Sequence, residues 1–137
     1  MHNIYLLNGR VKFLHRLIVI INVSLGAVGR SLGLHGSIHF LKILLLQLYI
    51  EKEYYDQALL MIDSFRHFLT REKSMLDSMK TSVMEFLKIT SDLVRIKSAV
   101  PDSDYDFKIE KIKQETESMS NNRFGIKLWL KEKVNQL

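Results

Sequence analysis

The stretch from Ile38 to Ile50 constrains the fold most, because ten of its thirteen residues are apolar. Only His39, Lys42 and Gln47 interrupt the apolar run. A helix on a protein surface carries one apolar stripe, whereas a helix that is apolar all round must be covered on most sides. Thirteen helical residues span about 20 Å, which is too short to cross a membrane. The stretch is therefore predicted to be a buried helix of a protein core.

A second helix is predicted over residues 55–71, directly after the polar run Glu51-Lys52-Glu53. Its apolar residues recur at intervals of three and four, as on one face of a helix: Tyr55, Ala58, Ile62, Phe65 and Leu69. Asp56 lies near the start of this helix and Arg71 near its end, as the helix dipole favours. The two helices, joined by a short polar turn, predict an antiparallel hairpin.

The hairpin carries the pattern Leu45-x3-Tyr49-x8-Ala58, with Tyr55 at the start of the second helix. This spacing resembles the first two-thirds of a tetratricopeptide repeat, a unit of stacked helix pairs. In that family the small Ala lets the paired helices approach closely, and the Tyr packs across the pair. The end of the repeat departs from the family, because Thr70 stands where its closing Pro falls.

A second resemblance comes from DSFRHFL at residues 63–69, which is followed by a long helical pattern and by KLWLKEKV at residues 127–134. These segments resemble uncharacterised bacterial helical-repeat proteins, for which no chemistry is assigned. The resemblances imply an all-α, right-handed stack of antiparallel helix hairpins, as in tetratricopeptide-like α-solenoids. An unrelated helical hairpin is the alternative. The residues predicted to pack the repeat are Leu45, Tyr49, Tyr55, Ala58, Ile62, Phe65 and Trp129.

Three more helices are predicted over residues 74–97, 104–119 and 122–135. The first has a seam of apolar residues and one Thr, three and four apart: Leu76, Met79, Val83, Phe86, Thr90 and Leu93. Charged residues occupy most of its other face, where Lys88 is expected to pair weakly with Glu85. Gly125 falls in the first turn of the last predicted helix, where it costs about 1 kcal/mol relative to Ala.

Residues 1–36 differ from the predicted helical-repeat domain, residues 37–137, because they hold five of the six glycines. Three interpretations stay open for this apolar segment. It is an export or anchor signal, with basic residues before its apolar run; or it is a buried strand or helix that covers the hairpin. If the segment is structured, a helix is expected over about residues 11–25. In the third interpretation it is the displaced or truncated start of a longer repeat array, whose polar cap the last two helices would form.

The net charge of +5 lies entirely in the first fifty residues, which contain five Lys or Arg and no Asp or Glu. Residues 51–137 contain fifteen residues of each sign. A nucleic-acid-binding protein places a basic stripe on its folded body, so no nucleic-acid partner is expected. The chain has no cysteine, which excludes disulfides and cysteine-ligated zinc and favours a cytoplasmic location.

Two pairs of side chains have a spacing that can carry chemistry. His35 and His39 are four residues apart, as two metal ligands on one helix face would be, but no third ligand is indicated nearby. A chance pair at a helix start is therefore the preferred interpretation. Asp63 and His67 have the same spacing and could orient a general base. A surface ion pair is the preferred interpretation there.

Asp102, Asp104 and Asp106 alternate like the first ligands of a calcium-binding loop. The glycine and the closing Glu of such a loop are missing, because Phe107 and Lys113 occupy their positions. The three acids are therefore predicted to form an N-cap cluster, in which Ser103-Asp104-x-Asp106 supplies the N-cap and the acids of the first helical turn. The sequence predicts no catalytic residue, no cofactor site and no metal site.

Taken together, these patterns predict a non-catalytic protein–protein interaction scaffold of the helical-repeat type. Its partner would be an unidentified protein or peptide, held on the surfaces of helix pairs. The aromatic residues are predicted to pack in the core, with a partner-binding groove as the alternative. The alternative function is that of a membrane-associated helical protein, anchored through residues 11–28.

Overall fold

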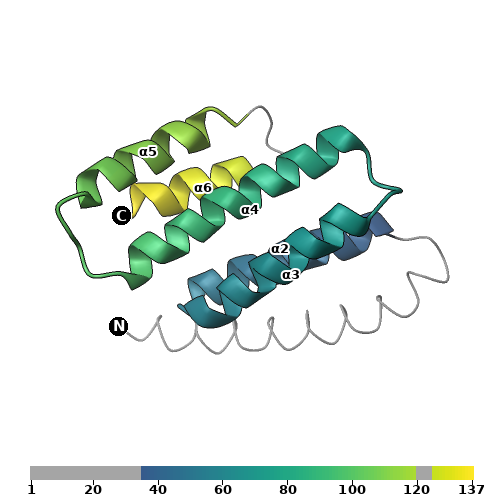
Figure 1. Cartoon of the computed structure of the whole chain (residues 1–137), viewed down its shortest axis with the longest axis horizontal. Helices are drawn as coiled ribbons and strands as arrows, with labels where there is room; N and C mark the ends of the chain where they lie inside the picture. The colour runs from purple at the N-terminus through teal and green to yellow at the C-terminus, as the bar shows by residue number, and fades with distance from the viewer. Residues whose placement is uncertain (1–34, 120–124) are drawn as a thin grey trace, which may run out of the picture. The chain divides into compact units, whose positions relative to one another are not determined.

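The computed structural model describes residues 35–119 and 125–137. Within these ranges the secondary structure is entirely helical, which confirms the all-α prediction (Figure 1). The five helices are α2 (His35–Glu51), α3 (Tyr55–Arg71), α4 (Asp77–Ser98), α5 (Tyr105–Glu117) and α6 (Ile126–Asn135). The helix predicted over residues 11–25, and with it the choice between the three interpretations of the N-terminal segment, lies outside the described residues.

The chain divides into two compact units, Met1–Ala58 and Leu59–Leu137, and the division falls inside α3. In the first unit, α2 begins at His35, earlier than the predicted Ile38. Its apolar side chains are covered on several sides: Ile43, Leu45, Leu46 and Ile50 are buried, whereas Leu41, Leu44 and Leu48 are half-buried. This burial agrees with the prediction that a helix without a polar face is an interior element.

The turn after α2 is a Schellman motif, a common helix ending in which one residue adopts the left-handed conformation. Glu53 has φ of 61° and takes the position that glycine usually occupies. The backbone N–H of Tyr54 donates to the carbonyl of Tyr49 at 2.8 Å, and that of Glu53 donates to the carbonyl of Ile50 at 3.0 Å. The rings of Tyr49 and Tyr54 lie 6.5 Å apart and add the apolar contact typical of this motif.

In the second unit, α4 contacts both α5 and α6, which also contact each other. The three helices run antiparallel in chain order and form a small bundle (Figure 1). α4 is the most extensively buried of them, because its buried residues are distributed around much of the helix. They are Ser82, Val83, Phe86, Leu87, Ile89, Thr90, Ser91, Leu93, Val94 and Ile96. α4 is therefore covered on more than one side.

The predicted start of α4 is wrong. The helix begins at Asp77, and Leu76, assigned to the packing seam, is 69% exposed and precedes the first helical turn. The cause is local, since the backbone N–H and the hydroxyl of Ser74 both donate to the Glu72 carboxylate. Such side-chain bonds compete with helix formation and hold these residues in a turn.

Two kinds of contact fasten α6 to its neighbours. The ring of Trp129 meets Phe86 of α4 edge-on, with centroids 6.1 Å apart. Lys127 donates from Nζ to the backbone carbonyls of Glu117 at 3.1 Å and Met119 at 3.0 Å, at the C-terminal end of α5. A cation there satisfies carbonyls that have no helical partner and suits the helix dipole. Lys131 adds an ion pair to the Glu117 carboxylate at 3.0 Å.

The prediction that Gly125 weakens the first turn of α6 is wrong. Gly125 precedes the helix as its N-cap residue, with φ of 70°. A left-handed conformation costs a residue with a Cβ atom about 1 kcal/mol, and glycine avoids that cost. The predicted start of this helix at residue 122 lies outside the described residues.

Replacing Gly125 by Ala is expected to lower the free energy of unfolding by about 1 kcal/mol, because Ala resists the left-handed conformation. A Cβ at this position meets no atom within 4 Å, so the loss reflects backbone conformation alone. Gly125→Asn is the matched control and should lose less, since Asn tolerates this conformation better. Urea denaturation measures the order. A more stable Gly125→Ala variant would place Gly125 inside the helix and contradict the structure.

Candidate functional site

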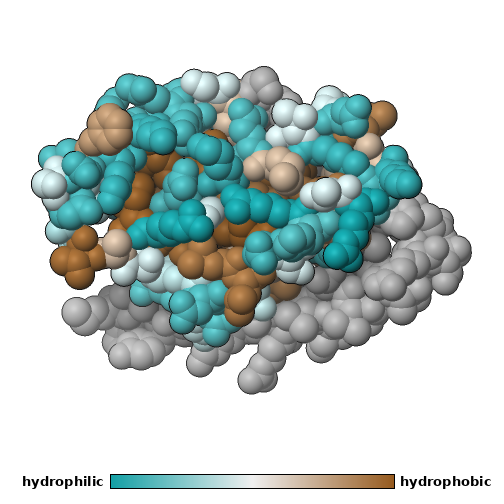
Figure 2. All heavy atoms as spheres, viewed as in Figure 1, coloured by the Kyte–Doolittle hydropathy of each residue, from teal (hydrophilic) through white to brown (hydrophobic). Residues whose placement is uncertain are grey.

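A groove runs between the C-terminal part of α4 and most of the length of α5, with a volume of about 320 Å³. We call it the α4–α5 groove. Its floor is apolar and is made by Ile96, which is 9% exposed, and Ile112, which is 1% exposed. Ala99 lies at its edge, and Val100, 87% exposed, stands at the loop end. On the face shown in Figure 2, apolar surface is visible between the hydrophilic side chains of these helices.

The loop at the end of the groove follows from Pro101. Pro101 disfavours the helical conformation at Val100, the residue before it. α4 ends just ahead of these residues, with Ala99 as its C-cap in an extended conformation, at φ −91° and ψ 155°. Asp102 then turns the chain into α5: its carboxylate accepts the backbone N–H of Asp104 at 3.0 Å and the ammonium group of Lys108 at 3.0 Å. The chain thus runs back along α4 as α5, and the groove lies between the two helices.

The segment predicted to supply the N-cap lies at the start of α5. Asp104 occupies the N-cap of α5, and Asp106 lies in the first turn, but the Asp104 side chain makes no capping hydrogen bond. Asp102 supplies the carboxylate contact instead, two residues earlier. The hydrogen bond from Lys108, together with the N–H of Asp104, lowers the pKa of the Asp102 carboxyl below its ordinary value.

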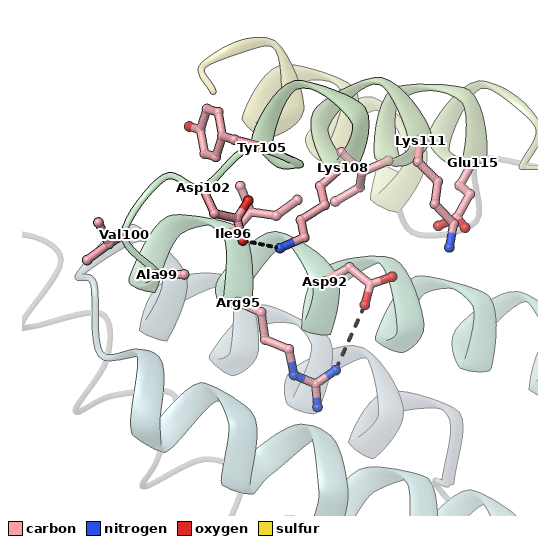
Figure 3. A pocket seen from close by; sticks show the side chains of 11 residues that line it. Asp92, Arg95, Ile96, Ala99, Val100, Asp102, Tyr105, Lys108, Lys111 and Glu115 are labelled. Carbon is pink, nitrogen blue, oxygen red and sulfur yellow. Dashed lines mark hydrogen bonds and ion pairs between the residues drawn. The ribbon is translucent and has the colours of Figure 1, made fainter.

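The rim of the groove carries charges of both signs (Figure 3). Asp92 and Arg95 extend from α4, and Lys108, Lys111 and Glu115 from α5. Outside the rim, Lys88 of α4 bridges the two helices. Its ammonium group donates to Glu115 Oε1 at 2.9 Å and lies 3.8 Å from the Asp92 carboxylate. The hydrogen bond to Glu115 raises the pKa of Lys88.

Lys88 was expected to pair with Glu85, but its ion pairs are with Asp92 on its own helix and Glu115 on α5. The reason is the approach of α5, which brings a second carboxylate to the Lys88 side chain. The sequence of α4 alone does not show a carboxylate that belongs to another helix. The contact ties α4 to α5 beside the groove.

The residues predicted to pack the repeat lie elsewhere, and none of them lines the α4–α5 groove. Their surroundings fall into two classes. Leu45, Ala58, Ile62 and Phe65 are buried, whereas Tyr49, Tyr55 and Trp129 are half-buried. Partial burial, with the charge of Glu53 as a smaller cause, raises the pKa of the Tyr55 hydroxyl.

The side-chain pairs singled out for chemistry are not assembled into a larger site. His39 is buried in α2, at 2% exposure, and the side chain of His35 lies outside the described ones. Asp63 and His67 form the predicted surface ion pair, with Oδ2 and Nε2 3.8 Å apart and both side chains more than two-thirds exposed. Within the described ranges, no three or more His, Cys, Asp or Glu side chains are grouped so that they could hold a metal ion.

Sequence reasoning missed the groove, because Arg95 lies on the exposed face of one helix and Lys108 and Lys111 lie on that of the next. Each face by itself looks like ordinary solvated surface. The available signal was Pro101, which forces a reversal between two amphipathic helices and so brings the ends of their exposed faces together.

Neither the family models, nor the curated proteins, nor the solved structures compared with the chain gave a match. The resemblance to tetratricopeptide repeats therefore stays a prediction. The structure supports the coarser statement, an all-α fold in which α4, α5 and α6 pack against one another in chain order.

The predicted membrane anchor, residues 11–28, lies outside the described residues. Among the helices that the structure describes, none combines the length and the apolar character that a membrane crossing requires.

Replacing Asp102 by Asn should lower the free energy of unfolding at pH 7, because the variant loses the charged contact with Lys108. The folded-state pKa of Asp102 is lowered, so its contribution is present above the unfolded pKa and is lost as the pH falls through the folded one. Chemical denaturation of both proteins should therefore give a difference at pH 7 that shrinks on acidification. A difference that persists unchanged in acid would exclude the ionised contact as its source.

Proposed function

We propose that the chain is a non-catalytic interaction scaffold, which binds a short segment of a partner protein in the α4–α5 groove. The observation that carries this proposal is the groove itself, with a floor of Ile96 and Ile112 and a rim of charges of both signs. Apolar walls with a few polar groups are typical of binding sites, because the walls supply affinity and the polar groups fix orientation.

The size of the groove supports a peptide segment as the occupant. Sites for small molecules usually range from about 300 to 1,000 Å³, and the volume of about 320 Å³ lies at the lower end of that range. It suits one or two side chains of an extended or helical segment. The floor is open along the groove between two antiparallel helices (Figure 3), so the rest of such a segment could continue over the rim.

The tetratricopeptide-like architecture is part of the proposal. It is supported by the spacing of Leu45, Tyr49 and Ala58 and by the burial of Ala58, which is 0% exposed. A buried alanine at this position suits the close approach that the family's small residue permits. In such arrays, surfaces formed by successive helices bind extended segments of partner proteins.

The test is a groove-filling substitution. Peptides that bind the purified chain are selected from a random phage-displayed library, and their dissociation constants are measured by isothermal titration calorimetry. Ala99→Trp should weaken binding at least about tenfold, because the indole ring would occupy the space beside Ile96. Thr81→Trp is the matched control and should leave binding unchanged, because Thr81 is exposed on the same helix and does not line the groove.

Two results would contradict the proposal. If the selection enriches no peptide, the chain lacks the proposed binding activity. If Ala99→Trp and Thr81→Trp bind the selected peptides equally well, the peptides bind elsewhere. Circular dichroism of each variant establishes that both remain folded.

A further inference from the structure

The charges that line the α4–α5 groove balance each other. Three acids stand against three cations: Asp92, Asp102 and Glu115 against Arg95, Lys108 and Lys111. The surrounding chain is equally balanced, since residues 51–137 contain fifteen residues of each sign. A charged partner is drawn to a surface by an excess of the opposite charge. The groove has no such excess.

The acids of the rim are paired with cations of the chain itself. Lys108 lies 3.0 Å from the carboxylate of Asp102, and Lys88 lies 2.9 Å from that of Glu115. The same Lys88 ammonium group is 3.8 Å from the carboxylate of Asp92. The second oxygen of Glu115, Oε2, is buried, so an occupant does not reach it. A basic occupant would therefore have to displace a cation of the chain before it could pair with an acid.

The cations of the rim do not converge on one point of the groove. Arg95 pairs with Asp92 at 3.9 Å, and Figure 3 shows its guanidinium group pointing away from α5. Lys111 is exposed and forms no ion pair with the other residues that the structure describes. A single exposed ion pair contributes little, because both partners lose hydration and side-chain freedom when it forms. An acidic occupant therefore gains little from the rim.

Apolar surface is what the groove offers to an occupant. Ile96 and Ile112 form the floor, and Val100 at the loop end is 87% exposed. An occupant that covers these side chains removes apolar surface from water. The resulting stabilisation is proportional to the apolar area that is covered and has no preferred sign of charge.

We infer that the α4–α5 groove selects an uncharged segment by the large apolar side chains that the segment carries. These side chains lie on Ile96 and Ile112 and against Val100. Uncharged flanking residues then pass over the rim without breaking its ion pairs. This inference rests on the proposed function and specifies the partner's chemistry. Because no charge is shared between the two partners, their affinity should be nearly independent of salt.

The probes are four acetylated octapeptides in a Gly-Ser background. Three of them carry two leucines separated by one residue and flanked by serines, by aspartates or by lysines. The fourth is the serine peptide with both leucines replaced by alanine. NMR titration of the full, isotope-labelled chain measures the dissociation constants, including weak ones.

The serine peptide should bind at least as tightly as the aspartate and lysine peptides. It should bind at least about tenfold more tightly than the alanine peptide, because the alanines cover much less apolar surface. Its dissociation constant should change by less than about twofold between about 50 and about 300 mM salt.

Val100→Ser should weaken binding of the serine peptide about threefold, because it removes apolar surface from the groove. Leu76→Ser is the matched control, since Leu76 is 69% exposed and does not line the groove. Its replacement should change binding by less than about twofold, as is usual for a surface residue away from a site. Neither substitution removes a buried side chain, so both variants should keep the fold.

The outcomes separate this inference from the proposed function. The inference is overturned if the aspartate or the lysine peptide binds more than about twofold better than the serine peptide, or if salt weakens binding by more than that. Equal binding of the leucine and alanine peptides, or equal effects of Val100→Ser and Leu76→Ser, would also overturn it. Each of these results would leave a peptide-binding groove in place, provided that Ala99→Trp weakens the binding. Absence of binding by all four peptides would overturn the inference, and if the library selection also enriches no peptide, the proposed function fails with it.

Discussion

The burial of α4 on more than one side is the constraint on which the second unit depends. Phe86, Leu87, Leu93 and Val94 are each 0% exposed. Full burial of an apolar side chain of this size stabilises a fold by roughly 1.5–3 kcal/mol. The other helices of the bundle contribute less: in α5 only Ile112 and Thr116 are buried along its thirteen residues. A helix of that length is marginal by itself in water, so α5 is held in place by packing against its neighbours.

The groove is a consequence of that arrangement. Pro101 ends one helix, the Asp102 carboxylate begins the next, and the chain returns antiparallel to α4. Ala99 has too small a side chain to fill the space between the two helices beside the loop. Lys88 ties them together further along, through Glu115. The same polar contacts that secure α5 therefore also pair most of the charges on the rim.

The helices could be predicted from the sequence, because they depend on the periodic burial of apolar side chains. The prediction for residues 55–71 coincides with α3, and most of the predicted α4 seam is buried. The errors arise where backbone conformation or side-chain contacts decide the outcome. Glu72 and Ser74 delay the start of α4, Gly125 adopts a left-handed conformation before α6, and Asp102 supplies the carboxylate contact at the start of α5. None of these effects leaves a periodic signal.

The groove was harder to predict from the sequence than the fold was. Arg95 and Lys111 are separated in sequence and lie on two different helices, and each belongs to a face that looks like ordinary solvated surface. Only the reversal at Pro101 brings them to one groove. The sequence also pointed to Ile38–Ile50 as the element around which the chain is organised. That helix is largely buried in the first unit, whereas α4 is the most extensively buried helix among α4, α5 and α6.

Amide hydrogen exchange, followed residue by residue in the intact chain, tests the deep burial of α4 most directly. Amides in the most deeply buried elements exchange slowly, since they open only in global unfolding. The slowest exchange in Leu59–Leu137 should therefore occur in the middle of α4, around Phe86 to Val94, with α5 opening at lower free energy. Exchange in α5 that is as slow as in α4, or rapid exchange throughout α4, would contradict the account.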